Sequence, residues 1–179
     1  MLFRSAVSNE AITANNARDF FVEVLDARQK ILIYANAPHP DISGLKQIIL
    51  ENKNYEVLTA FASDTPPDFS VFNLVIFHNL PSDKYEITSV VQNLRRKEIP
   101  SIFVVGAQTS TEKFNRVQNV IQIKGSSSNT EEIQGDINPL FSQFTTSETL
   151  KSRLRTFPPL ITPFGEYSAL GGTNVFIYQ

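Results

Sequence analysis

Apolar and polar residues alternate in blocks along the middle of the chain. Residues 31–35 (ILIYA) are apolar without a break, and residues 71–77 (VFNLVIF) and 100–105 (PSIFVV) are nearly so. Such runs, bounded by turn residues, are typical of strands covered on both faces, as in a parallel sheet. Residues 55–61 (YEVLTAF) alternate more, which favours an edge or half-covered strand. A short apolar run at 120–123 predicts a fifth strand.

Between these runs, apolar residues recur at helical spacing. Asp41 is the expected N-cap of the first helix, and Ser82 or Asp83 is the expected N-cap of the second. Thr109 and Glu112, three residues apart, resemble a capping box that opens a third, short helix. The apolar faces of the first two helices are formed by Ile42, Leu45, Ile48 and Ile49, and by Ile87, Val90, Val91 and Leu94.

Strand and helix therefore alternate from Lys30 to Lys124, with connections of a few residues. This alternation predicts an α/β fold: a three-layer, open, mostly parallel sheet with right-handed crossovers. A flavodoxin-like strand order is the arrangement we expect.

The N-terminal flank differs from this pattern. Residues 11–14 and 20–25 predict a β-hairpin, so we divide the chain into a hairpin arm at 1–26 and an α/β domain at 27–179. A two-stranded hairpin is marginally stable alone. We therefore expect the apolar strand 20–25 to dock on its own sheet or to pair with a second copy as a homodimer.

The alternation also ends after Lys124, and the C-terminal segment is expected to be irregular. Residues 125–129 (GSSSN) predict a flexible turn, and Ser147 a short helix. Residues 157–165 hold three prolines, so they are expected to be extended but not an interior strand. Residues 174–178 (NVFIY) predict a strand.

Composition excludes several classes of function. Sixteen basic and eighteen acidic residues give a net charge of −2 without a basic block, which argues against nucleic-acid binding. The chain has no cysteine, which excludes disulfides, thiolate metal sites and cysteine nucleophiles. No apolar run approaches the ~18 residues that a membrane span needs. We expect a soluble chain that carries no signal peptide.

Polar residues gather where the predicted strands end. The two histidines, His39 and His78, follow the first and third strands, which are neighbours in a flavodoxin-like order, so they should meet at one edge of the sheet. One interpretation is a polar binding cleft, and a sharper one is a metal site of His39, Asp41 and His78. The third is purely structural: Asp41 caps a helix, His39 is fixed between two prolines, and His78 bonds backbone. The full candidate cleft is Asn36, His39, Asp41, His78, Asn79 and Gln108.

Two familiar chemistries are missing. A nucleophile elbow needs Ser or Cys on a tight turn after a strand, but the corresponding segment, 106–110 (GAQTS), places Gln108 there. Ser110 is better placed as a helix N-cap than as a nucleophile. Neither GxGxxG nor a Walker motif follows the first strand, so we expect no nucleotide, flavin or other cofactor.

Four segments carry a resemblance to a known family. They are KILIYANAPHPDISGLKQIILENKNYEV, FNLVIFHNLP, IFVVG and FPPLITPFGEY. Together they resemble bacterial membrane-anchored envelope proteins that also carry von Willebrand factor type A and immunoglobulin-like regions. The domain similar to this chain is C-terminal and resembles class I glutamine amidotransferases. The resemblance spans residues 19–179, with APHPD and the PPL and PFG.Y elements as its most specific parts.

The resemblance implies a place in a larger protein. Residues 8–26 look like the last hairpin of a preceding immunoglobulin-like domain, and the partners would be other domains of the parent chain or other envelope proteins. Because Gln108 stands at the matched nucleophile position, glutamine hydrolysis is not carried over. The resulting hypothesis is a non-catalytic binding module, a pseudoenzyme. The alternative is a metal-assisted hydrolase that uses His39, Asp41 and His78.

Overall fold

The computed structural model describes residues 28–178, apart from the side chains of residues 126–128. The hairpin expected in residues 11–25, and with it the proposed pairing strand, lies outside the described residues. In chain order the elements are β1 (Gln29–Ala35), α1 (Pro40–Leu50), β2 (Tyr55–Phe61), the 3₁₀ turn η1 (Phe69–Val71), β3 (Leu74–His78), α2 (Thr88–Arg96), β4 (Ser101–Val104), α3 (Thr111–Val117), β5 (Ile121–Ile133), β6 (Asp136–Ile137), α4 (Glu148–Leu154), β7 (Leu160–Ala169) and β8 (Ile177–Tyr178).

Four parallel strands in the order β2-β1-β3-β4 form the main sheet. The α/β class and the parallel sheet are therefore confirmed, and the strand order is compatible with a flavodoxin-like layout. The 55–61 strand lies at an edge, as its alternation indicated. β1 lies between β2 and β3, and five of its seven residues are buried, which explains its unbroken apolar run.

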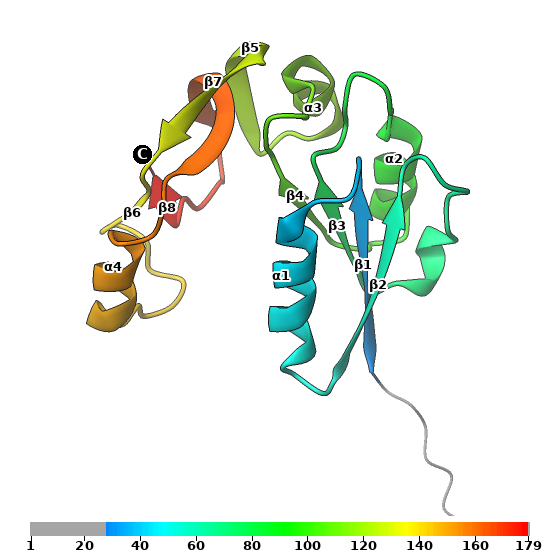
Figure 1. Cartoon of the computed structure of the whole chain (residues 1–179), viewed down its shortest axis with the longest axis horizontal. Coiled ribbons are helices and arrows are strands. Elements are labelled where there is room, and N and C mark those ends of the chain that lie inside the picture. The colour runs from blue at the N-terminus through cyan, green and yellow to red at the C-terminus, as the bar shows by residue number, and fades with distance from the viewer. Residues whose placement is uncertain (1–27, 179) are drawn as a thin grey trace, which may run out of the picture.

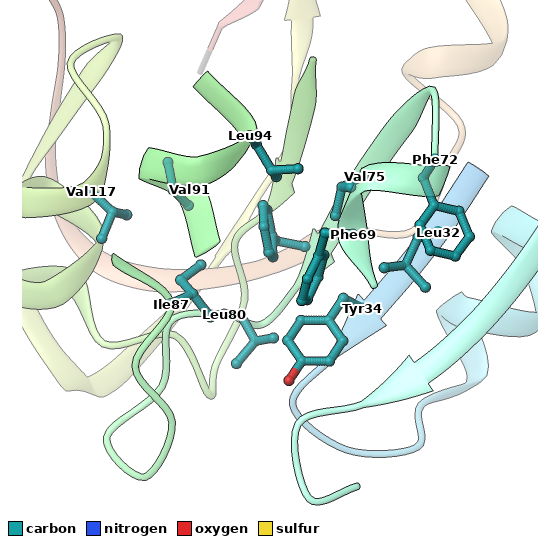
Figure 2. Packing of buried hydrophobic residues seen from close by; sticks show 11 residues of the cluster. Leu32, Tyr34, Phe69, Phe72, Val75, Leu80, Ile87, Val91, Leu94 and Val117 are labelled. Carbon is teal, nitrogen blue, oxygen red and sulfur yellow. The ribbon is translucent and has the colours of Figure 1, made fainter. Parts of the chain in front are cut away.

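The sheet is covered by helices on both faces (Figure 1). On one face, Ile33 and Ala35 of β1 pack with Ile42 of α1. On the other, Leu32 and Tyr34 belong to a larger cluster with residues of η1, β3, α2 and α3. Figure 2 shows these side chains converging from the sheet and from α2. Successive side chains of β1 point alternately to the two faces of the sheet and pack into the two clusters in turn. A helix layer on each face, and so three layers in all, is needed to cover both clusters.

The start of α1 differs from the prediction. The N-cap is His39, whose Nδ1 accepts a hydrogen bond from the Asp41 N–H at 3.3 Å, so the assignment of Asp41 as the cap is wrong. Pro40 is the reason. Its fixed φ suits the first helical position and it has no N–H to satisfy, so the helix begins at the proline and the residue before it becomes the cap.

The starts of α2 and α3 also differ. Neither Ser82 nor Asp83 caps a helix: α2 begins at Thr88, and the Ser82 hydroxyl accepts a hydrogen bond from the Tyr85 N–H at 3.1 Å within a loop. The capping box at Thr109 is wrong as well, because the Thr109 hydroxyl accepts from the Gly106 N–H at 3.1 Å. Ser110 does occupy the N-cap position of α3, although among the described residues its side chain makes no capping bond.

The third strand is shorter at its start than its apolar run suggested. Residues 69–71 form η1, which Asp68 caps by accepting from the Ser70 N–H at 2.9 Å. The Asn73 side chain then accepts a hydrogen bond from the Lys30 N–H at 2.8 Å. A side chain here makes the bond that a backbone carbonyl of a paired strand would otherwise make. Phe72 is apolar because it is buried in the core and not because it belongs to a strand, whereas Val71 is exposed.

The C-terminal segment is more regular than expected. β5 is 13 residues long and pairs antiparallel with β7, so it is not a fifth strand of the parallel sheet. Residues 125–129 lie within β5 and do not form a turn, and the register of the pair shifts between Ser126 and Thr130. Pro163 lies opposite Thr130 in this pair, and a proline is tolerated there because both strands of a two-stranded sheet are edges.

Two further predictions concern this segment. Ser147 caps α4 by accepting from the Leu150 N–H at 3.1 Å, as predicted. The strand expected at 174–178 is reduced to β8, which pairs with β6.

Two amide side chains attach the C-terminal segment to α3. Asn115 donates to the Ile123 carbonyl at 2.8 Å and accepts from the Ile123 N–H at 2.9 Å, as a neighbouring strand would. Gln118 donates to the Ile121 carbonyl at 2.6 Å and accepts from the N–H groups of Val120 and Ile121. These bonds fix the first residues of β5 beside the α/β core.

Among residues 28–178, none of the helices is both long enough and apolar enough to cross a bilayer.

The buried hydrophobic cluster that contains Phe77 should contribute most to the stability of the fold. Phe77 in β3 is fully buried and stacks on Phe103, with ring centroids 5.1 Å apart. We expect Phe77→Ala to lower the free energy of unfolding by about 3–5 kcal/mol, because it removes buried area and leaves a cavity. Phe157, which is 54% exposed, is the matched control, and Phe157→Ala should change it by less than about 0.5 kcal/mol. Urea denaturation measures both, and equal losses would contradict this account of the core.

Candidate functional site

The carboxyl ends of three parallel strands are held side by side. Ala35 of β1 is in register with His78 of β3, and His78 with Val104 of β4. Two backbone hydrogen bonds extend this alignment into the loops: the Asn36 N–H donates to the His78 carbonyl at 3.0 Å, and the Asn79 N–H donates to the Val104 carbonyl at 2.9 Å. The loops that follow the three strands therefore share one edge of the sheet.

The first group at this edge consists of His39, Asp41 and His78, which we name the histidine cluster. Asp41 Oδ2 lies 3.3 Å from His39 Nδ1 and 3.6 Å from His78 Nε2. One potential ligand atom from each of the three side chains lies within 4.8 Å of the others. The two imidazole rings face each other at a tilt, with their centroids 5.0 Å apart. His78 is almost fully buried, whereas His39 and Asp41 are exposed.

Burial of the His78 ring lowers its pKa from the ordinary value. The hydrogen bond and charge of the Asp41 carboxylate act in the opposite direction, and the nearby His39 adds to the lowering. The pKa of His78 nevertheless falls, so the ring is held neutral near pH 7. A neutral imidazole has one nitrogen lone pair available as an acceptor or a ligand.

Asn79 links the histidine cluster to the loop after β4. Its Nδ2 lies 3.5 Å from His78 Nδ1, and its Oδ1 accepts from the Thr109 hydroxyl at 3.5 Å. The backbone of Asn79 is left-handed, with φ 54°, a conformation that Asn tolerates better than most residues. A Cβ at Gly106 would lie 2.6 Å from Asn79 Oδ1, so only glycine lets this loop approach so closely.

The second group consists of Asn36 and Gln108. The Asn36 amide donates to Gln108 Oε1 at 2.8 Å, which joins the loops after β1 and β4. Both residues line an open pocket of about 500 Å³, which we name the amide pocket. Its other lining residues are Ala37, Pro38, Ser63, Ser82, Asp83, Lys84 and Tyr85.

One wall of the amide pocket is the loop that precedes α2. Lys113 of α3 holds this loop, because its Nζ donates to the carbonyls of Ser82 at 2.9 Å and Asp83 at 2.7 Å. The ammonium group of Lys84 lies 5.0 Å from the centre of the Tyr85 ring, in a cation–π contact. The wall therefore presents a cation, a carboxylate and a phenol.

The structure brings the six candidate residues to one edge of the sheet, but in two groups instead of one cleft. The histidine cluster lies on one side, the Asn36–Gln108 pair on the other, and Asn79 contacts His78. The interpretation that these residues are purely structural needs two corrections. The helix cap is His39 and not Asp41, and within residues 28–178 the His78 ring contacts the side chains of Asn79 and Asp41 and not the backbone.

Sequence reasoning missed several contributors to the site, among them Asp83, which was expected only as a possible helix cap. Lys84 and Tyr85 were assigned to a helix, although the polar run 81–86 (PSDKYE) after a strand is typical of a loop. Thr109 was assigned to a capping box. Lys113 acts on backbone carbonyls about thirty residues earlier in the chain, and no local pattern could have indicated that contact.

The arrangement limits the chemistry that this edge can perform. Gln108 has no nucleophilic atom, and Ser110 is buried at the start of α3. What remains is a set of hydrogen-bonding groups around the amide pocket and three nitrogen and oxygen donors in the histidine cluster. The fold and site define an α/β protein with a polar site at the carboxyl edge of a parallel sheet. Comparisons with protein-family models, with curated proteins and with solved structures found no significant match.

The lowered pKa of His78 has a measurable consequence. Below pH 6.5, its ordinary value, the unfolded chain takes up a proton at His78 while the folded chain does not, until the pH reaches the lower folded pKa. The unfolding free energy that His78 contributes should be full above pH 6.5 and fall as the pH drops through that window.

The imidazole signals in a proton NMR titration test this directly. The chain has two histidines, so the variant His39→Gln leaves a single signal to follow. We expect its midpoint below 6.5, and a midpoint at or above that value would contradict the burial argument.

The close approach at Gly106 gives a second test. In Gly106→Ala the new methyl group collides with Asn79 Oδ1, so we expect lower stability and a shifted His78 imidazole signal. Gly44, in α1, is the control because no described atom lies within 4 Å of a Cβ there. Gly44→Ala should raise the free energy of unfolding by up to about 1 kcal/mol and leave the His78 signal in place. An unshifted His78 signal in Gly106→Ala would contradict the proposed contact between the Asn79 side chain and the His78 ring.

Proposed function

We propose that the chain is a non-catalytic binding module with a glutamine amidotransferase-like, flavodoxin-like fold. In this proposal it binds a ligand or a protein partner within a larger bacterial envelope protein. The observation that carries the proposal is the position of Gln108. By the sequence resemblance, Gln108 is matched to the nucleophile position of amidotransferase-like domains. In the structure, its side chain accepts a hydrogen bond from the Asn36 amide at the amide pocket.

The loop after β4 supports the absence of covalent catalysis. A nucleophile has to be exposed above the carboxyl end of the sheet and close to a general base. The hydroxyl of Thr109 is committed to the Gly106 N–H and to Asn79, and Ser110 is 6% exposed. The whole chain lacks cysteine. The loop after β4 therefore offers the Gln108 amide, and no free hydroxyl or thiol, to a ligand in the amide pocket.

The amide pocket indicates which ligands such a module would take. Asn36 and Gln108 offer hydrogen-bonding amides, while Asp83 and Lys84 offer one charge of each sign. A volume of about 500 Å³ lies within the range of small-molecule sites. The pocket suits a small polar molecule, or a short polar peptide segment of a partner, that carries both donors and acceptors.

The proposed setting in the cell envelope is supported by the sequence resemblance of residues 19–179. In that setting the partners would be other domains of the parent chain or neighbouring envelope proteins. The strand order β2-β1-β3-β4 is compatible with the flavodoxin-like layout that the resemblance implies.

The proposal predicts no turnover of substrates that amidotransferase-like or related hydrolytic sites cleave. We expect no ammonia release from glutamine and no hydrolysis of p-nitrophenyl acetate or p-nitrophenyl phosphate above the protein-free background. Coupled glutamate detection and absorbance assays measure these rates. Turnover that disappears in Ser110→Ala would overturn the proposal and assign a serine hydrolase.

The alternative, a metal-assisted hydrolase, is favoured by one observation, the convergence of His39, Asp41 and His78 within 4.8 Å. The same assays are therefore repeated with added Zn²⁺. Zinc-dependent turnover that is lost in Asp41→Asn would replace the binding module with this enzyme.

A further inference from the structure

We propose that the histidine cluster is a binding site for a divalent transition-metal ion of the Zn²⁺ class. His39, Asp41 and His78 would be its protein ligands. The proposal concerns metal occupancy alone, and it does not depend on the amide pocket or on turnover.

The donor set suits such an ion. Two imidazole nitrogens and one carboxylate oxygen are the combination found in zinc sites with three protein ligands and in sites of non-haem iron. Sites of this kind keep the remaining coordination positions open to water or to a ligand. Here the exposed His39 and Asp41 side chains leave such an open side toward solvent, while His78 forms the buried wall.

The distances are close to those that a tetrahedral ion requires. Bonds of about 2.0–2.1 Å at tetrahedral angles place neighbouring ligand atoms about 3.3 Å apart. Asp41 Oδ2 lies 3.3 Å from His39 Nδ1 and 3.6 Å from His78 Nε2. All three side chains offer ligand atoms within 4.8 Å of one another, and the wider separation can close through the exposed His39 and Asp41 side chains.

His39 and Asp41 bring two potential ligand atoms together at the start of α1. His39 Nδ1 has one lone pair, which accepts a hydrogen bond from the Asp41 N–H at 3.3 Å. An ion bound through this nitrogen would exchange that cap bond for a metal–nitrogen bond. Asp41 Oδ2 lies 3.3 Å from the same nitrogen, so the carboxylate is within reach of an ion placed there. The positive end of the α1 dipole opposes a cation, and the negative charge of Asp41 offsets it.

The Asn79 side chain can hold His78 in the tautomer that metal binding requires. To bind metal through Nε2, His78 has to carry its proton on Nδ1 and donate it to an acceptor. Asn79 is at that position, and turning its amide would present the oxygen to His78 and the NH₂ group to Thr109. The Thr109 hydroxyl can accept that bond, because a hydroxyl serves as donor or acceptor.

Calorimetric titration of ZnCl₂ into the full chain, freed of metal with a chelator, tests the site. We expect one Zn²⁺ per chain, bound at micromolar concentration, together with NMR shifts of both imidazole signals. Asp41→Asn should weaken binding by at least about 10-fold, because it removes the charged ligand while keeping the shape of the side chain. His39→Gln, also at an exposed position, should weaken it similarly.

The matched control is Asp64→Asn, which removes the same charge from an exposed carboxylate outside the cluster. Its affinity should stay within about 2-fold of the unaltered chain, and circular dichroism checks that each variant is folded. Absence of heat at tens of micromolar zinc would overturn the metal site and leave the binding-module proposal intact. An equal loss in Asp41→Asn and Asp64→Asn, or imidazole signals that do not move, would also overturn it.

Discussion

The alignment of three strand ends is the constraint on which the rest of the structure depends. β1 lies between β2 and β3, and its pairing keeps Ala35 level with His78, which is itself level with Val104. Because a parallel register fixes all strands together, the loops after β1, β3 and β4 begin at one height. Each loop places a polar side chain at the same edge.

The fixed strand ends restrict the first residues of each loop, and specific residues meet that restriction. Pro40 starts α1 and makes the preceding His39 its cap. Asn79 turns through a left-handed conformation, and Gly106 lets the next loop pass beside it. The polar side chains of the site thus also hold the loops in shape, so the groups that could meet a ligand are the groups that build the edge.

Sequence reasoning succeeded where the signal is local and periodic. The runs at 31–35 and 55–61 correctly predicted β1 and β2. A strand buried on both faces has a continuous apolar run, and a strand buried on one face has alternating apolar residues, so the order of residues reveals both. The meeting of His39 and His78 could be anticipated because parallel strands end at one edge. Contacts set by distant partners could not. β5 is antiparallel because it pairs with β7, about 40 residues later, and nothing between 121 and 133 specifies that partner.

The attachment of the C-terminal segment has a mechanical consequence. β5 departs from the α/β core through bonds made by two amide side chains, Asn115 and Gln118, at its first residues. A load applied along β5 away from α3 would pull on these bonds and on the packing of the buried Ile123. The four-stranded sheet, whose carboxyl ends form the polar edge, contains no strand of the C-terminal segment and would bear no part of its pairing.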